Sequence, residues 1–277
     1  MENEISPLKK YQRTPKLFID LPSKGNYYPK GVLDKVEELE VYSMTASDEL
    51  MVRTPDALFT GQAVKNVIEH CVPAIKNALL IPTLDVDYIL AAIRMASYGD
   101  TINMSATCPA CSENSDYGIE VQRVMDHFDN RSFKNETRIE DFLFRIRPFT
   151  YKELTEIQKK TILLQRQIVQ KTPGPEDDQN ETELGEIYTT INQIATDAVC
   201  AMVTEVVTPD GDTENNPNFI RDFIINNDKV FYNGLKELQE QNVNSWKLPD
   251  VEVSCGSCEN KFSVATTLDY SNFFVRG

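Results

Sequence analysis

The sequence predicts an α+β fold that is mainly helical, with short antiparallel strands, a base built on two CxxC turns and a long helical hairpin. Three observations carry this prediction. Two CxxC motifs lie far apart in the chain, several runs place apolar residues at helical spacing, and short alternating runs flank the cysteines. With 277 residues, 41% of them hydrophobic and 26% charged, the chain is long enough to bury a substantial core.

Four regions are predicted along the chain. Residues 1–35 form an extended N-terminal arm, which the prolines and glycine of LPSKGNYYP interrupt with a turn. Residues 36–149 form an α/β base that contains the first CxxC motif. Residues 150–247 are inserted as a helical hairpin and further helices, and residues 248–277 return as strands with the second CxxC motif.

Within the base, the alternating run ELEVY predicts a strand at residues 39–42, and Thr45 or Ser47 caps the helix that follows. A helix is predicted over residues 62–80, with a kink near Pro73, and another over residues 84–97, which Gly99 ends. Short strands are predicted at residues 102–107, 117–122 and 142–147.

The inserted region begins with Thr150-Tyr-Lys-Glu153, a capping box that opens a helix running to about Lys171. Its apolar positions follow the 3-4 spacing of a coiled coil, at Leu154, Ile157, Thr161, Leu164 and Ile168. A similar stripe continues at Ile187, Ile191, Ile194, Ala198, Met202 and Val206.

Between the two stripes, the segment TPGPEDDQNETELG is predicted to be a mobile loop because it combines prolines, glycines and acids. The simplest assembly is an antiparallel helical hairpin between Tyr151 and Val206. Its apolar stripe is either the core of the hairpin or a docking surface for another helix. Further helices are predicted from Asn218 and over residues 229–241, and strands follow from Pro249.

The two CxxC motifs are near repeats. Cys108 and Cys111 lie in TCPACSEN, Cys255 and Cys258 lie in SCGSCEN, and each pair falls on a predicted strand–turn–strand with an aromatic residue beyond it. Such turns are zinc knuckles, and two of them supply the four thiolates that fill a tetrahedral ion. The prediction is therefore one closed, structural zinc-ribbon-like site that ties the C-terminal strands to the base.

The four cysteines allow three other interpretations. Iron uses the same four ligands and stays an alternative, although electron transfer needs a compact redox domain. A thioredoxin-like dithiol needs one CxxC at the head of a helix, whereas both motifs here lie on turns. A catalytic zinc needs an open position for water, and four cysteines leave none.

Charge and motif content limit the function classes. The chain holds 28 Lys and Arg against 43 Asp and Glu, a net charge of −15 that disfavours nucleic acid. No apolar run reaches membrane-spanning length, and the start MENEISPLKK lacks the apolar core of a secretory signal, so a reducing cytoplasm is expected. With only two histidines, His70 and His127, and no phosphate loop or catalytic motif, neither enzyme activity nor a small-molecule substrate is expected.

Several segments together resemble a family of contractile-tailed bacteriophage proteins, the baseplate hub and hub-assembly proteins of T-even-type myoviruses. They are LPSKGNYY, VYSMTASDELM, CVPAIKN and LDVDYILAAIRMASYGD, followed by the CPAC knuckle, and RPFTYKEL and the CGSC knuckle extend the likeness. The resemblance implies a late virion or assembly protein that contacts other tail proteins, in the tail baseplate or in the host bacterial cytoplasm during assembly.

Two functions follow as hypotheses. The first is a structural or assembly protein of the baseplate hub, with partner contacts through the N-terminal arm (Leu21, Pro22, Gly25, Tyr27, Tyr28) and the hairpin (Leu154, Ile157, Leu164, Ile168). The alternative is a zinc-ribbon nucleic-acid-binding or transcription-regulating protein. It requires a basic face around the knuckles, and residues 108–122 and 249–262 contain almost no Lys or Arg.

Overall fold

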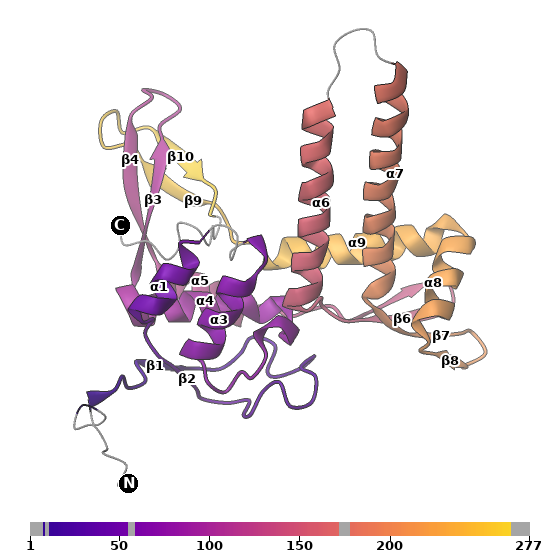
Figure 1. Ribbon diagram of the computed structural model, residues 1–277, viewed down its shortest axis with the longest axis horizontal. Coiled ribbons are helices and arrows are strands. Elements are labelled where there is room, and N and C mark those ends of the chain that lie inside the picture. Colours follow the sequence, from indigo (N-terminus) through magenta and orange to yellow (C-terminus); the bar gives the residue numbers. More distant parts are fainter. Residues whose placement is uncertain (1–7, 9–10, 55–58, 172–177, 267–277) are drawn as a thin grey trace, which may run out of the picture. The chain divides into compact units, whose positions relative to one another are not determined.

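The computed structural model describes residues 8, 11–54, 59–171 and 178–266, with no side-chain description for 170–171 and 178–183. The chain divides into two compact units (Figure 1). Unit 1 takes residues 1–81, 85–130 and 248–277, and unit 2 takes residues 82–84 and 131–247. Across the described residues, no helix is both long and apolar enough to cross a membrane.

Unit 1 is built around two buried helices, α3 (Gln62–Cys71) and α4 (Thr83–Tyr98). Their apolar positions recur at helical spacing, so each helix places a continuous stripe in the core, including Val64, Ile68 and Ile89. Among the described residues, shorter helices accompany them: α1 (Ala46–Val52), the 3-10 helix η2 (Ala78–Leu80) and α5 (Val121–Asp129). The sequence did not predict α5.

The predicted cap of α1 is confirmed. Thr45 is the N-cap, and its hydroxyl accepts from the backbone N–H of Asp48 while the Asp48 carboxylate accepts from the Thr45 N–H. The helix predicted over residues 62–80 is shorter than expected, because α3 ends at Cys71 and Val72 leaves the helical region with φ −128°. Pro73 disfavours a helical residue before it, so it ends this helix instead of bending it.

The strands described in unit 1 form three separate antiparallel pairs. β1 (Leu17–Ile19) pairs with β2 (Leu39–Val41), β3 (Thr101–Thr107) pairs with β4 (Asn114–Glu120), and β9 (Val251–Ser254) pairs with β10 (Lys261–Val264). The strands predicted beside each CxxC motif are therefore present. Each motif lies at the tip of its own hairpin, β3–β4 or β9–β10.

The predicted extended arm departs from the structure where the structure describes it. Residues 17–19 form β1, and Leu21 is only 2% exposed. The following turn is held by Asp85 of α4, which accepts from the Ser23 backbone N–H (2.9 Å), the Ser23 hydroxyl (2.5 Å) and the Tyr28 hydroxyl (2.9 Å). Residues 1–7 and 9–10 of the arm lie outside the described residues.

Gly25 shows why this turn is specific to its sequence. Its φ is +74°, in the left-handed region that favours glycine. A Cβ built there would lie 2.8 Å from Cγ1 of Val36, so the close approach also excludes a side chain. The prolines and glycine of LPSKGNYYP thus form a packed turn of unit 1.

In the residues described for unit 2, a four-stranded antiparallel sheet combines with four helices. The strand order is β5 (Glu136–Ile139), β6 (Phe142–Ile146), β7 (Val203–Val207) and β8 (Thr213–Glu214). The helices are α6 (Tyr151–Lys171), α7 (Asp178–Ala201), α8 (Pro217–Asn226) and α9 (Lys229–Trp246). Residues 131–149, predicted as part of the base, group with this unit because β6 pairs with β7.

The core of unit 2 lies between this sheet and the helices α7, α8 and α9. Phe144 and Val206 of the sheet join Val199, Ile220 and Leu235 in one buried cluster. Phe142, Phe144, Phe223 and Phe231 form an aromatic group within it, with ring centroids 5.0 to 6.5 Å apart. Ring contacts at these distances add to the free energy of apolar burial.

The helical hairpin is present, with two changes at its ends. α6 and α7 lie side by side, as Figure 1 shows, and the predicted capping box opens α6, with the Thr150 N–H 2.8 Å from Glu153 Oε2. Helix α7 ends at Ala201, so Val206 belongs to strand β7 and not to the stripe of the hairpin. Part of the predicted loop, from Asp178 on, is helical, and its residues 172–177 lie outside the described residues.

Candidate metal centre

The first knuckle, residues 108–113, is a tight turn at the tip of the β3–β4 hairpin. The Cys108 N–H donates to the Glu113 carbonyl (2.8 Å), and the Ser112 N–H donates to the Cys108 carbonyl (2.9 Å). Ser112 has φ +61°, the left-handed conformation that closes the turn. These two hydrogen bonds close the turn, so that Cys108 and Cys111 lie near each other in one short loop.

The second knuckle, residues 255–260, repeats this geometry at the tip of the β9–β10 hairpin. The Cys255 N–H donates to the Asn260 carbonyl (2.9 Å), and the Glu259 N–H donates to the Cys255 carbonyl (3.0 Å). Glu259 has φ +57°, at the position that corresponds to Ser112. The sequence repeat CPAC and CGSC is therefore also a repeat of backbone structure.

The two knuckles bring their four thiols together. Every sulfur lies within 4.8 Å of the other three, in what we call the cysteine cluster (Cys108, Cys111, Cys255 and Cys258). Across the knuckles, Cys108 Sγ is 3.7 Å from Cys258 Sγ, and Cys111 Sγ is 3.5 Å from Cys255 Sγ. These separations far exceed the roughly 2.05 Å of a disulfide bond, and all four cysteines are free.

The geometry of the cluster fits one tetrahedral metal ion. Four thiolates around zinc, with Zn–S bonds of about 2.3 Å, would lie about 3.8 Å from one another. The two measured cross-knuckle distances are close to that value. Four sulfur ligands complete the tetrahedron, so such an ion would keep no position for water or substrate.

Backbone amides favour the ionised form of the first cysteine in each knuckle. Burial raises the pKa of Cys108, but the amides of Cys111 and Ala110 donate to its sulfur and lower the pKa to about 6. The amides of Ser257 and Cys258 likewise lower the pKa of Cys255. Thiolates are the form that binds metal, so these amides prepare two of the four ligands.

The other cysteine of each knuckle behaves in the opposite way. The backbone N–H of Glu113 lowers the pKa of Cys111, but its hydrogen bonds with Cys258 and Cys255 outweigh this effect and raise the pKa to about 12. The Asn260 amide and Cys111 lower the pKa of Cys258, but burial and the hydrogen bonds with Cys108 and Cys255 together raise it. Four sulfurs this close cannot all ionise unless a cation balances their charge.

Side chains around the cluster also join the two hairpins. The Asn260 side-chain nitrogen lies 4.0 Å from Cys108 Sγ and so reaches from one knuckle to the other. Tyr117 of β4 and Phe262 of β10 meet edge to face, with ring centroids 6.0 Å apart. The sequence shows an aromatic residue beyond each knuckle, but only the structure shows that the two rings touch.

The other predicted site residues lie on two separate surfaces. In the N-terminal turn, Leu21 is buried, while Pro22, Gly25, Tyr27 and Tyr28 are half-buried. On α6, the stripe faces α7 and is half-buried throughout, at Leu154, Ile157, Leu164 and Ile168. The sequence missed Asp85, which is fully buried, because an acid in the first turn of a helix ordinarily signals a solvated helix start.

Comparison with known proteins places the chain in a family. Residues 20–275 match the family model described as T4 bacteriophage base plate protein. The chain belongs to this family. No curated protein and no solved structure shows significant similarity to the chain. This match confirms the resemblance to T4-type baseplate proteins that the N-terminal segments and the two knuckles indicated, and membership of the family implies contacts with other phage tail proteins.

Proposed function

We propose that this base plate family member is a structural or assembly protein of the baseplate hub, that it acts by protein–protein contacts without enzymatic activity, and that its cysteine cluster holds one structural zinc ion. The proposal rests on the family match over residues 20–275 and on the four thiols, whose sulfur atoms lie close enough together to surround one tetrahedral ion. The ion would join hairpins whose cysteines lie 144 and 150 positions apart in the chain.

A metal assay tests the zinc assignment directly. Protein purified without added metal is expected to contain about one zinc per chain by mass spectrometry of its elements, and to be colourless. Cys255→Ser removes one ligand and is expected to lower the zinc content to a small fraction. The matched control is Cys200→Ser, which alters a buried cysteine of α7 outside the cluster.

Two results would contradict this assignment. Stoichiometric iron with a red colour would make the site a rubredoxin-like centre, the alternative that the same four ligands permit. Full zinc content in the Cys255→Ser variant would mean that zinc is bound elsewhere.

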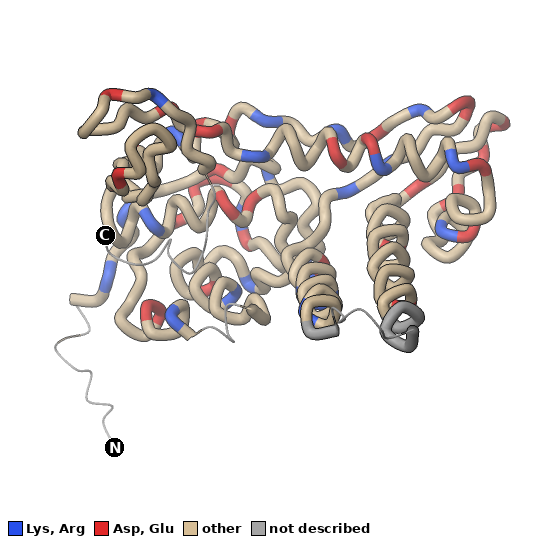
Figure 2. Tube along the Cα trace, turned by 90° about the horizontal axis from the view of Figure 1, so that it is seen from above, with Lys and Arg blue, Asp and Glu red and all other residues tan. Residues whose placement is uncertain are grey.

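The alternative of a zinc-ribbon nucleic-acid-binding protein is less well supported. Lys261 is the one basic residue within 108–122 and 249–262, whereas acids flank both knuckles, among them Glu113, Asp116 and Glu259. Figure 2 shows Lys and Arg interspersed with Asp and Glu along the trace. Such a surface does not concentrate positive potential against a phosphate backbone.

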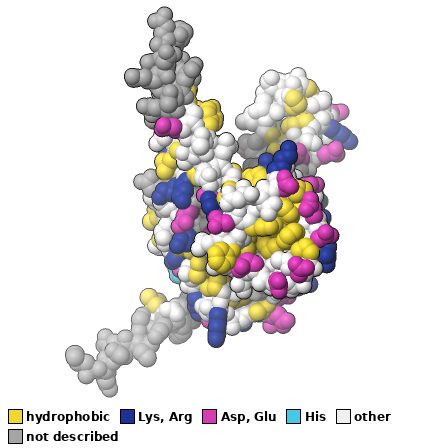
Figure 3. Space-filling model, turned by 90° about the vertical axis from the view of Figure 1, so that its right-hand side faces the viewer, with side chains coloured by type: hydrophobic (Ala, Val, Ile, Leu, Met, Phe, Trp, Pro, Cys, Tyr) yellow, Lys and Arg dark blue, Asp and Glu magenta, His cyan; other side chains and the backbone are white. Residues whose placement is uncertain are grey.

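Exposed apolar side chains on unit 2 are the surfaces that we propose for partner contacts. Along α6, Ile162, Leu163 and Val169 are exposed beside the half-buried stripe, and Val169 is 76% exposed. Phe219 of α8 is 61% exposed. Figure 3 faces the side of unit 2 on which α8 lies, and hydrophobic side chains gather there among acidic ones.

A location experiment tests the hub role. The protein is expected to co-purify with tail proteins from infected cells, either in finished particles or only in assembly intermediates, and these two results distinguish a permanent part from an assembly helper. Absence from both fractions would contradict a baseplate role. Phe219→Ser is expected to weaken this association, with Phe18→Ser, an exposed aromatic of β1 in unit 1, as the matched control.

A further inference from the structure

Helix α6 has a second amphipathic side, directed away from the stripe that packs on α7. Lys159, Ile162, Leu163, Arg166 and Val169 follow one another at positions i, i+3, i+4, i+7 and i+10, so they lie on one side of the helix. All five are exposed, and the three apolar side chains are 37%, 44% and 76% exposed in chain order. We call these five residues the outer face of α6.

The outer face is basic as well as apolar. Residues 157–171, IQKKTILLQRQIVQK, contain four bases and no Asp or Glu. The chain as a whole has a net charge of −15, so this run departs from the charge of its surroundings. It gives the hairpin a local positive potential in an acidic protein.

Helix α7 shows how a solvated outer side looks in the same hairpin. Its positions farthest from the inner stripe include Gly185, Thr189 and Asn192, which are exposed and have no large apolar side chain. Residues 184–201 contain the acids Glu186 and Asp197 and no Lys or Arg. Solvent contact alone therefore does not account for three large aliphatic side chains on the outer face of α6, and their exposure to water is unfavourable unless another surface covers them.

The chemistry of the outer face defines its occupant. Residues 159–169 extend for about 15 Å along the helix axis, the length of about three turns of a second helix. Helices pack by interlocking side chains at three- and four-residue spacing, which is the spacing of the apolar residues here. The complementary partner is therefore a helix with an apolar stripe and with carboxylates on the borders of that stripe.

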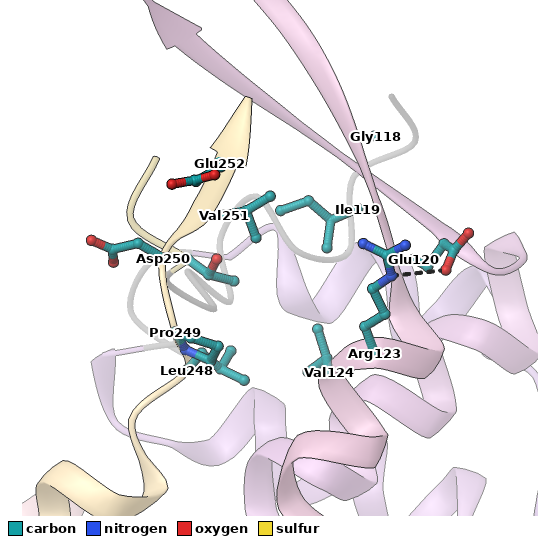
Figure 4. Close-up of a pocket in the computed structure, with 11 residues that line it drawn as sticks. Gly118, Ile119, Glu120, Arg123, Val124, Leu248, Pro249, Asp250, Val251 and Glu252 are labelled. Atoms are coloured by element: carbon teal, nitrogen blue, oxygen red, sulfur yellow. Dashed lines mark hydrogen bonds and ion pairs between the residues drawn. The ribbon is translucent and has the colours of Figure 1, made fainter. Parts of the chain in front are cut away.

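A second copy of this chain fits the outer face poorly. The outer side of α7 is acidic but has no apolar stripe to offer. The other acidic surface with apolar residues is a groove in unit 1, between residues 118–124 and 248–252, where Ile119 and Val251 point inward and Glu120 and Glu252 lie at the rim (Figure 4). Its volume of about 470 Å³ admits a few side chains, whereas a helix with its side chains is about 10 Å across.

We propose that the outer face of α6 binds an acidic amphipathic helix of another tail protein, with the partner's apolar side chains on Ile162, Leu163 and Val169 and its carboxylates beside Lys159 and Arg166. The inference rests on the proposed function, because it names the chemistry of a partner for the hairpin. An anionic membrane also attracts basic amphipathic helices, but the net charge of −15 opposes the approach of this chain to such a surface.

Two synthetic helical peptides test the proposal on the full-length protein. Both place leucines at i, i+3, i+4 and i+7, and the bordering positions are glutamates in one peptide and lysines in the other. The glutamate peptide is expected to bind at least about tenfold more tightly than the lysine peptide, and this difference should shrink as salt is raised. Equal affinities of the two peptides would overturn the proposal.

The double variant Ile162→Gln/Val169→Gln locates the binding site. Glutamine keeps a high helix propensity and removes the apolar contact, so the affinity for the glutamate peptide is expected to fall at least about tenfold. Val243→Gln on α9 is the matched control, because Val243 is also an exposed aliphatic residue of unit 2, at 62%. Unchanged affinity in the double variant would place the peptide elsewhere and refute the assignment to α6.

Lys159→Glu tests the charge of the site. The variant is expected to bind the glutamate peptide at least about fivefold more weakly at low salt, whereas Lys229→Glu, at an exposed lysine of α9, is expected to bind it as wild type does. Equal weakening by the two variants would mean that only the overall charge matters, which contradicts a local site.

Two further measurements separate this partner from other occupants. Vesicles of phosphatidylcholine with phosphatidylglycerol are expected not to retain the protein, and retention that the double variant abolishes would make a membrane the occupant. The mass in solution is expected to be the same for wild type and double variant over a range of concentrations. Self-association of wild type alone would make a second copy the occupant, and either result would overturn the proposal.

Co-purification from infected cells distinguishes failure of this inference from failure of the hub role. Wild-type protein that is absent from tail particles and assembly intermediates would contradict the proposed function itself. If wild type is present and Ile162→Gln/Val169→Gln is retained equally well, the hub role stands and the inference about α6 is wrong. The expected result is retention of wild type and of Val243→Gln, with the double variant reduced at least about tenfold.

Discussion

Asp85 is the residue on which the N-terminal turn of unit 1 depends. Its carboxylate is fully buried and accepts three hydrogen bonds, two from Ser23 and one from Tyr28. A buried acceptor of this kind holds together two segments that are about sixty residues apart in the chain. Its loss would leave the two hydroxyls and the amide without a partner in a site closed to water.

Asp85→Ala is therefore expected to lower the free energy of unfolding by about 3 kcal/mol, the cost of several buried donors left unpaired. Urea denaturation measures this change. Asp34→Ala is the control, because it removes the exposed Asp34–Lys76 ion pair, which is expected to contribute less than about 0.5 kcal/mol. Similar losses of unfolding free energy in the two variants would mean that the buried hydrogen bonds of Asp85 stabilise the fold no more than an exposed ion pair does.

The same carboxyl predicts a pH dependence. Burial raises the pKa of Asp85 from 3.8 to about 6, against the lowering effect of its hydrogen bonds from Ser23 and Tyr28. The folded chain thus binds this proton more tightly than the unfolded chain, so the group's contribution to stability is fully present below about pH 4 and is lost as pH rises through about 6. The difference in unfolding free energy between wild type and Asp85→Asn is expected to fall from pH 4 to pH 7. A difference independent of pH would contradict this prediction.

The start of α6 is stabilised by a charged capping network. Arg147 donates to both oxygens of Glu153, at 2.8 and 2.6 Å, and Glu153 also accepts from the Thr150 amide and hydroxyl. Burial raises the pKa of Glu153, but these bonds, chiefly those from Arg147, lower it to about 2. The network therefore joins the end of β6 to the first turn of the hairpin.

Acid titration tests this network. Because the folded pKa of Glu153 lies below its ordinary 4.5, the carboxylate stabilises the fold above about pH 4.5, and this contribution is lost as pH falls through about 2. Arg147→Gln is expected to raise that pKa, so the helical signal should be lost at a higher pH than in wild type. The control is Arg123→Gln, which removes an exposed ion pair of α5. Identical acid transitions in the two variants would contradict the role of Arg147.

The hairpin separates an inner stripe from an outer surface. Ile187 of α7 is buried in the stripe, whereas its neighbour Tyr188 is 54% exposed. Ile187→Ala is expected to cost about 2–4 kcal/mol of unfolding free energy through a cavity, and Tyr188→Ala less than about 0.5 kcal/mol. Thermal unfolding of the two variants measures the difference. Equal destabilisation would mean that the stripe is not the packed interface of the two helices.

At the scale of the whole molecule, the cysteine cluster joins the first half of the chain to its C-terminal strands. Unit 2 lies between these two parts in sequence, so the chain leaves unit 1 and re-enters it at Leu248. A crosslink that closes such a long loop reduces the entropy of the unfolded chain, as a disulfide does. If the cluster holds the proposed metal, the stability of unit 1 should depend on that metal, and the stability of unit 2 should not.

Removal of metal by a strong chelator is expected to speed hydrogen exchange in residues 101–120 and 251–264 and to leave residues 199–246 unchanged. Because both units are measured in the same sample, the exchange of unit 2 serves as an internal control for the exchange of unit 1. Cys108→Ser is expected to mimic the chelator, and Cys71→Ser, which alters a buried cysteine of α3, is the control for loss of a thiol elsewhere in unit 1. A uniform loss of protection over both units would contradict a local clamp.

Many local features of this protein can be predicted from short-range sequence patterns. The two knuckles, the caps at Thr45 and Thr150 and the stripe of α6 depend on residues within about four positions of one another, so the sequence displays them directly. The pairing of the two CxxC motifs was also predictable, because a half-filled metal site requires a second half. The family resemblance was carried by these same short segments.

Contacts between distant residues were decided only by the tertiary structure. The burial of Asp85, the pairing of β1 with β2, the grouping of β5 and β6 with α7 and the meeting of Tyr117 with Phe262 all join residues that the sequence separates. Whether an acid is solvated or buried, and which strand a half-exposed run pairs with, depends on what packs against it. By itself the sequence determined the four clustered cysteines and the local elements. The packing of distant segments determined the burial of Asp85 and the division into two units, because burial is a property of neighbours in space.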